Sequence, residues 1–185
     1  VIPEYNLSIL RACIAARCDY LDMATGQTQD RTIDENFLAM MELDDEIKSL
    51  GGTATLVPAD MRDFDAIDRL GAAIFERWKR LDILIGNAGI LGKLTPVAHV
   101  EPKLWDEVMG INVTANYRLI RSLDPLLQRS DAGRVVFMSS GASTRAEPRA
   151  YWGLYATTKA ALDMIGRSYA AETKNISNIR VSLFN

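Results

Sequence analysis

The chain has 185 residues, of which 48% are hydrophobic and 24% are charged, and its formal net charge at pH 7 is −3. This composition is typical of one globular domain that buries a core without disulfides or metal ions. The slight acidic excess gives no reason to expect nucleic acid or an anionic membrane as a partner, and no apolar run is long enough to cross a bilayer. A small molecule is the more natural ligand.

The two cysteines, Cys13 and Cys18, have the spacing of neither a CxxC redox pair nor half a zinc site. We interpret them as buried thiols in a reducing, cytoplasmic setting, and we expect no metal site. The sequence begins with Val1 rather than Met and ends at Asn185 on an expected strand. Both features are consistent with a chain that is incomplete at its ends.

The first fifty residues have a weak pattern. Their hydrophobic periodicity predicts a helix over residues 9–17, a strand over 20–23 and a helix over 37–50 that stops at the glycine pair 51–52. Residues 26–34 are polar and aperiodic, and we expect a loop there.

After residue 53, short strand-like runs alternate with helical patterns. Strands are expected over residues 54–57, 81–85, 134–138 and 179–184. One helix is capped by Asp63 and runs to Trp78, a long helix begins at Pro102 and continues toward Pro125, and a third covers residues 153–172. This alternation predicts a single α/β domain over residues 1–185, a Rossmann-type, doubly wound parallel sheet with helices on both faces.

Ligands bind to such sheets beyond the carboxyl ends of the strands. Four segments occupy these positions: Asp60-Met61, Asn87-Ala88-Gly89, Ser139-Ser140, and the run from Tyr155 to Lys159 at the head of the last helix. Tyr155 and Lys159 share one helical face, and a neighbouring ammonium lowers the pKa of a phenol from its ordinary value of about 10. An isolated pair of this kind is most often a surface pair, so the argument for a site depends on the four segments together.

With Asn112 inside Ile-Asn-Val-Thr, these segments in this order resemble the short-chain dehydrogenase/reductase family, and bacterial classical-type members are the most similar. The resemblance covers about residues 43–185. It implies an NAD(P)-dependent oxidoreductase that interconverts a carbonyl and an alcohol by hydride transfer, with NAD or NADP as cofactor. It also implies a homodimer or homotetramer, formed through the outer faces of the helices that begin near Pro102 and Gly153, including Tyr117 and Tyr169.

The same resemblance implies a role for each catalytic residue. Tyr155 would act as the acid/base on the substrate oxygen, and Lys159 would lower the pKa of Tyr155 and bind the nicotinamide ribose. Ser140 would hydrogen-bond the substrate oxygen, and Asn112 would hold a water of the proton relay.

Further residues are implied in cofactor binding. The adenine would contact Asp60 and Met61, and the turn of small residues Asn87, Ala88 and Gly89 would let the backbone approach the cofactor closely.

The choice of serine has alternatives. The spacing usual in the family places the serine at position 142, which is Ala142 here. Ser140 is preferred because it follows the strand directly, and two extra residues in the loop 144–149 would explain the offset. Ser143 and Ser139 remain as alternatives.

One feature of the family is missing from the sequence. A glycine-rich turn that binds the cofactor diphosphate is expected within the first twenty residues, but the first glycine is Gly26. Residues 5–24 instead show a faint similarity to saccharopine-dehydrogenase-like proteins. A non-catalytic fragment or pseudoenzyme that keeps the fold is therefore the alternative hypothesis, and the sequence decides neither the substrate nor the preference between NAD and NADP.

Overall fold

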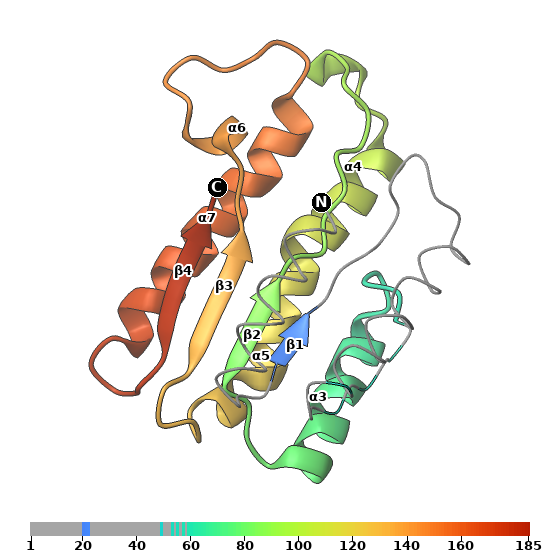
Figure 1. The fold of residues 1–185 in the computed structure, drawn as a ribbon. Coiled ribbons are helices and arrows are strands. Elements are labelled where there is room, and N and C mark those ends of the chain that lie inside the picture. The colour runs from blue at the N-terminus through green and yellow to red at the C-terminus, as the bar shows by residue number, and fades with distance from the viewer. Residues whose placement is uncertain (1–19, 23–48, 50–52, 54, 56, 58) are drawn as a thin grey trace.

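The computed structural model describes residues 20–22, 49, 53, 55, 57 and 59–185, and the structural statements below refer to this part of the chain. Its centre is a parallel sheet with the strand order β1-β2-β3-β4 (Figure 1). The strands are β1 (Tyr20–Asp22), β2 (Ile83–Gly86), β3 (Arg134–Met138) and β4 (Arg180–Phe184).

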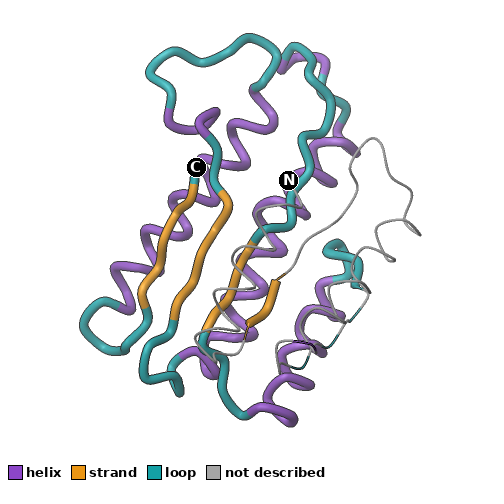
Figure 2. The backbone as a smooth tube through the Cα atoms, in the orientation of Figure 1, coloured by secondary structure: helices purple, strands orange, loops and turns teal. Residues whose placement is uncertain are grey.

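Helices connect these strands along the chain, as Figure 2 shows. They are α3 (Phe64–Trp78), the short 3₁₀ helix η1 (Val97–His99), α4 (Pro102–Met109), the π-helical segment η2 (Gly110–Thr114), α5 (Ala115–Leu127), the short α6 (Gly141–Thr144) and α7 (Gly153–Thr173). The parallel α/β fold expected from the sequence is thus confirmed.

The helix ends follow from local sequence signals. The Asp63 side chain caps α3 by accepting a hydrogen bond from the Ala66 backbone N–H at 2.9 Å. The helix ends at Lys79, whose backbone is left-handed with φ of 61°. Proline at the first position of α4 has no N–H to leave unpaired, so the start at Pro102 is also as predicted.

The core lies between the sheet and one layer of helices. In β3 the alternate residues Val135 and Phe137 are fully buried, whereas Arg134 is exposed. Helix α7 packs on β3 and β4, α5 packs on β2, and α3 lies beside α5. Close packing of α7 depends on Gly166, because a Cβ there would lie 2.6 Å from Leu183 Cδ2.

Several expected boundaries need correction. The strands expected over 81–85 and 179–184 start later, at Ile83 and Arg180. Thr55 and Val57 are not in a strand, although a strand was expected over 54–57. The long helix expected from Pro102 is interrupted by η2.

Tyr169 also differs from expectation. It is not on an outer face available to a second subunit, because the residue is only 6% exposed and its hydroxyl donates a hydrogen bond to Asp124 Oδ1 at 2.6 Å. This contact ties α7 to α5 within one chain.

Other expectations fall outside the described residues. These are the helix over 9–17, the loop over 26–34, the two cysteines, the glycine pair 51–52, the helix over 37–50 except for the helical Ser49, and the second helical layer of a doubly wound sheet. The strand expected at 20–23 is present as β1. Within the described part, no helix has the length and apolar character needed to span a membrane, and no group of His, Cys, Asp and Glu could hold a metal ion.

Candidate functional site

The segments that follow β2 and β3 meet the head of α7 at the carboxyl edge of the sheet. Lys159 is at the centre of this region: its Nζ donates a hydrogen bond to the Met138 carbonyl oxygen at 2.6 Å. A Cβ placed on Gly89 would lie 3.4 Å from both Lys159 Nζ and Asn112 Oδ1. The structure therefore brings together Gly89, Asn112 and Lys159, which are far apart in the sequence.

Asn112 is fully buried within the π-helical segment η2. Its Oδ1 accepts a hydrogen bond from the Ile90 N–H at 2.8 Å, and its Nδ2 donates to the Ile90 carbonyl and to Thr158 Oγ1, both at 2.9 Å. Single π turns inside α-helices are frequent at functional sites. Both amide hydrogens are used within the protein, so a relay water would have to be held by an Asn112 oxygen.

Lys159 is 4% exposed. Burial lowers its pKa to about 8, and the negative charge of Asp163 opposes this shift. An ammonium has three N–H donors, and among the described residues only the Met138 carbonyl accepts one of them. Two donors are left for a ligand.

Tyr155 lies one helical turn before Lys159, in the first turn of α7. The centre of its ring is 5.7 Å from Lys159 Nζ and 6.1 Å from the Trp152 ring, which meets it edge-on. Its side chain is partly exposed, and its hydroxyl makes no hydrogen bond with another described residue. The phenol is thus both close to a cation and open to a ligand.

The three candidate serines differ in what their hydroxyl groups do. The Ser139 hydroxyl donates to Asp163 Oδ1, and Ser143 Oγ lies 2.7 Å from both Asp163 Oδ2 and the Ser140 carbonyl oxygen. Ser140 caps α6: its Oγ accepts from the Ala142 N–H at 3.2 Å, and within the described part of the chain its hydroxyl hydrogen is not donated. Of the three, Ser140 is the one that can donate to a ligand without breaking an internal bond.

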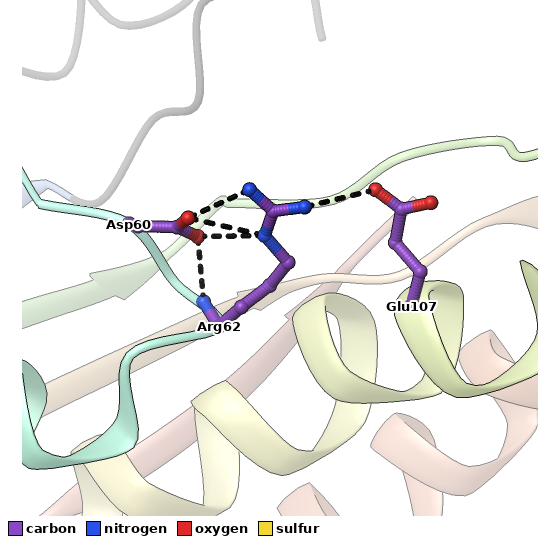
Figure 3. A network of polar contacts seen from close by, with 3 residues as sticks. All are labelled: Asp60, Arg62 and Glu107. Carbon is purple, nitrogen blue, oxygen red and sulfur yellow. Dashed lines mark hydrogen bonds and ion pairs between the residues drawn. The ribbon is translucent and has the colours of Figure 1, made fainter. Parts of the chain in front are cut away.

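Asp60 is on an exposed turn before α3 and is held by Arg62, as Figure 3 shows. Its carboxylate accepts from the Arg62 backbone N–H at 2.8 Å, from Nε at 3.0 Å and from Nη2 at 2.7 Å. These bonds hold the pKa of the Asp60 carboxyl below its usual value. Arg62 Nη1 also lies 3.4 Å from Glu107 Oε1, so the network joins the turn to α4.

The other residues expected at the cofactor are less exposed to solvent than Asp60. The Met61 side chain is 3% exposed and belongs to the hydrophobic core, so only its backbone is in a position to meet a ligand. Asn87 and Ala88 are 2% and 3% exposed and directly follow β2.

Three residues of this region were not predicted from the sequence. Arg62 and Glu107 had no signal beyond the position of Arg62 two residues after Asp60. Asp163 had one, because it lies four residues after Lys159 and therefore on the same helical face.

Comparison with known proteins gives matches along most of the chain. The profile of the family described as short chain dehydrogenase matches residues 21–185, which extends further toward the N-terminus than the resemblance seen in the motifs. Residues 5–19, in which the faint saccharopine-dehydrogenase-like similarity begins, lie outside both this match and the described residues.

Two curated relatives illustrate the match in sequence. The chain is 38% identical over 117 residues to the uncharacterized oxidoreductase YciK of Escherichia coli. This match covers 63% of this chain and 45% of that protein. It is 34% identical over 114 residues to an uncharacterized NAD-dependent oxidoreductase of Mycobacterium tuberculosis. That match covers 61% of this chain and 40% of the relative. The chain thus spans less than half the length of these relatives.

Solved structures are similar as well. A short chain dehydrogenase from Salmonella enterica has a TM-score of 0.73 and 31% identity, with 84% of this chain and 62% of that chain covered. A short chain dehydrogenase from Shigella flexneri, complexed with NADP, has a TM-score of 0.72 and 31% identity, with coverage of 84% and 63%.

Proposed function

The chain belongs to the short chain dehydrogenase family, and from this premise we propose that it serves an NAD(P)-dependent oxidoreduction that interconverts a small-molecule carbonyl and alcohol. The observation that carries the proposal is the buried Lys159 ammonium, which has two donors unused by the described residues and lies beside the Gly89 turn, Asn112 and the Tyr155 ring. The NADP in the Shigella flexneri structure and the NAD dependence named for the Mycobacterium tuberculosis relative support either cofactor.

The residues present fit a nicotinamide cofactor at the ribose end. A buried ammonium with free donors suits a pair of ribose hydroxyls, because these accept hydrogen bonds without adding charge. Glycine at position 89 keeps open the space that a Cβ would take 3.4 Å from Lys159 Nζ. When bound, the cofactor supplies or accepts a hydride at C4 of the nicotinamide ring. For the phosphate end, the glycine-rich turn usual in the family is missing from the first twenty residues of the sequence.

Proton transfer is the task of Tyr155 in this proposal. As the carbonyl carbon gains the hydride, the Tyr155 hydroxyl donates its proton to the carbonyl oxygen and later regains a proton from solvent; oxidation of the alcohol runs these steps in reverse. Lys159 places its ammonium 5.7 Å from the centre of the Tyr155 ring, so a positive charge lies beside the group that transfers the proton. Ser140 donates its hydroxyl hydrogen to the same substrate oxygen, which holds the carbonyl in place.

The remaining residues bind and orient. Asn112 holds the backbone at Ile90 and the hydroxyl of Thr158, and one of its oxygens would hold the relay water. Asp60 and the backbone at Met61 would face the adenine, and Asn87 and Ala88 would form the wall of the cofactor site with Gly89.

Further parts of the proposal concern the whole protein. We expect one domain over residues 1–185, a homodimer or homotetramer, a cytoplasmic location, and no nucleic acid or membrane partner. The substrate is placed only at the level of a small carbonyl or alcohol.

Cofactor titration tests the proposal directly. NADPH and NADH are titrated into the purified protein, and binding is followed by nicotinamide fluorescence and by calorimetry. Micromolar affinity that Lys159→Ala weakens is the expected result. No binding up to millimolar cofactor would instead support the non-catalytic fragment, which the missing glycine-rich turn favours.

A further inference from the structure

A buried carboxylate that has no role in the proposed reaction forms hydrogen bonds with serines of the segment that follows β3. Asp163 is on α7, one turn after Lys159, and is 6% exposed. Its Oδ1 accepts a hydrogen bond from the Ser139 hydroxyl, and its Oδ2 lies 2.7 Å from Ser143 Oγ. A buried carboxylate is costly unless it is well hydrogen-bonded, so this arrangement calls for an explanation.

The two serines stand on either side of Ser140. The backbone at Ser140 is extended, with φ of −162° and ψ of 142°, so successive side chains there point to opposite sides. Fixing Ser139 toward Asp163 therefore turns the Ser140 side chain away from Asp163. On the other side, Ser143 Oγ lies 2.7 Å from the Ser140 carbonyl oxygen, and the Ser143 N–H donates to the same oxygen at 3.0 Å.

The same face of α7 holds this segment at a second place. Tyr155, Lys159 and Asp163 follow one another at intervals of four residues, which places them on one helical face. Lys159 holds the Met138 carbonyl, while Asp163 holds Ser139 and Ser143. The segment 138–143 is thus fastened to the helix face that also carries Tyr155.

We propose that Asp163 is a positioning residue. By accepting hydrogen bonds from the serines on both sides of Ser140, it fixes the Ser140 hydroxyl relative to Tyr155. The inference rests on the proposed function, because it assigns Ser140 and Tyr155 to one substrate oxygen. A misplacement of about 1 Å can cost about a hundredfold in rate, so a device that fixes this geometry has a large effect available to it.

A matched control is available at the opposite end of the sheet. Asp82 is 8% exposed, and its Oδ1 accepts from Ser130 Oγ at 2.5 Å and from Arg80 Nε at 2.9 Å. It is thus another buried aspartate bonded to a serine, but it precedes β2, whereas the candidate site follows the carboxyl ends of the strands. Loss of Asp82 should affect stability alone.

The first measurement follows catalysis in the purified protein, with NADPH and an aromatic aldehyde as the probe pair. We expect Asp163→Ala to lower kcat about ten- to hundredfold while KM and the NADPH affinity change by less than about threefold. Asp82→Ala should lower Tm and leave kcat unchanged. Adding Ser140→Ala to Asp163→Ala should lower kcat further by much less than Ser140→Ala does alone, because both act through one hydroxyl.

The second measurement needs no substrate. Deuterium exchange of the segment 138–144 should be faster in Asp163→Ala than in the wild type, and unchanged in Asp82→Ala. If Asp163→Ala does not fold, Asp163→Asn and the double variant Ser139→Ala/Ser143→Ala provide the same tests. Asp163→Asn should recover part of kcat, because its amide oxygen still accepts from one serine.

The outcomes separate the two proposals. A wild-type protein that neither binds NADPH nor reduces the aldehyde overturns the proposed function, and the role of Asp163 in the reaction fails with it. An active wild type whose Asp163 variants keep kcat, or keep wild-type exchange over 138–144, overturns the positioning role alone.

Discussion

The Lys159 ammonium donates a hydrogen bond to the Met138 carbonyl oxygen at 2.6 Å, which joins the head of α7 to the last residue of β3. The contact places a cation in a largely buried position, with 4% of the side chain exposed. Its pKa falls to about 8 because burial disfavours the charged form.

This pKa gives stability a defined dependence on pH. The ordinary pKa of lysine, 10.5, applies to the unfolded chain, and the folded value of about 8 is lower. Between these two values the unfolded state binds more protons, so the contribution of Lys159 to the free energy of unfolding rises as pH increases from about 8 to about 10.5. The difference in free energy of unfolding between the wild type and Lys159→Met, measured by urea denaturation across this range, should show that rise. A difference that stays constant with pH would contradict the lowered pKa.

The Tyr155 hydroxyl gives a sharper test of the reaction. Tyr155→Phe removes one oxygen and should keep the fold and the NADPH affinity, while turnover falls about a hundred- to ten-thousandfold, the usual contribution of general acid–base catalysis. Steady-state kinetics and fluorescence titration measure the two effects. Near-normal turnover in this variant would remove Tyr155 from the mechanism.

Lys159→Ala should behave differently from Tyr155→Phe. The ammonium is proposed to bind the ribose hydroxyls and also lies beside the Tyr155 ring, so this variant should lose affinity and turnover together. Fluorescence titration with NADPH measures the loss of affinity, and steady-state kinetics measures the loss of turnover. Wild-type affinity in Lys159→Ala would contradict the ribose contact.

Assembly can be tested on the exposed aromatic residues of α4 and α5. Trp105 is 36% exposed and Tyr117 is 50% exposed, and a second subunit would cover them in the expected dimer. Tyr117→Glu should therefore shift sedimentation of the protein toward the monomer at micromolar concentration. Ile176→Glu is the matched control, because Ile176 is 77% exposed beyond the end of α7 and should leave assembly unchanged. A wild-type protein that sediments as a monomer would count against the expected interface.

The elements that could be predicted from the sequence are those determined by local signals. Asp63 caps its own helix, Pro102 starts one, and the spacing of four between Tyr155 and Lys159 specifies a shared helix face. Each of these signals depends on residues within a few positions of one another.

The features that were missed depend on contacts between distant segments. The π turn is stabilised by bonds from Asn112 to Ile90 and Thr158, which lie 22 and 46 residues away. Likewise, what distinguishes Asp163 from other helical residues is the hydrogen bond from Ser139, which lies 24 residues before it. Hydrophobic periodicity carries no information on such pairs.

Asn112 provides the last prediction, because its side chain bridges the segment after Gly89 and helix α7. Asn112→Ala leaves the partly buried Ile90 N–H and carbonyl without their partner, and an unsatisfied polar group costs about 1–3 kcal/mol when it is buried. We expect the free energy of unfolding to fall by about 2–3 kcal/mol, measured by urea denaturation with tryptophan fluorescence. Gln128→Ala, which removes an exposed side-chain bond to Asp124, should change it by less than about 0.5 kcal/mol.

A second substitution at the same position separates hydrogen bonding from shape. Asn112→Asp keeps the volume and the acceptor for the Ile90 N–H, but an ionised carboxylate cannot donate to the Ile90 carbonyl and would face that oxygen instead. The folded protein should therefore favour the protonated carboxyl and raise its pKa, so that the variant loses stability relative to the wild type as pH rises through the raised pKa. The stability difference between Asn112→Asp and the wild type should be smaller at pH 5 than at pH 8. An equal difference at both pH values would show that the bond from Nδ2 to Ile90 contributes little to the fold.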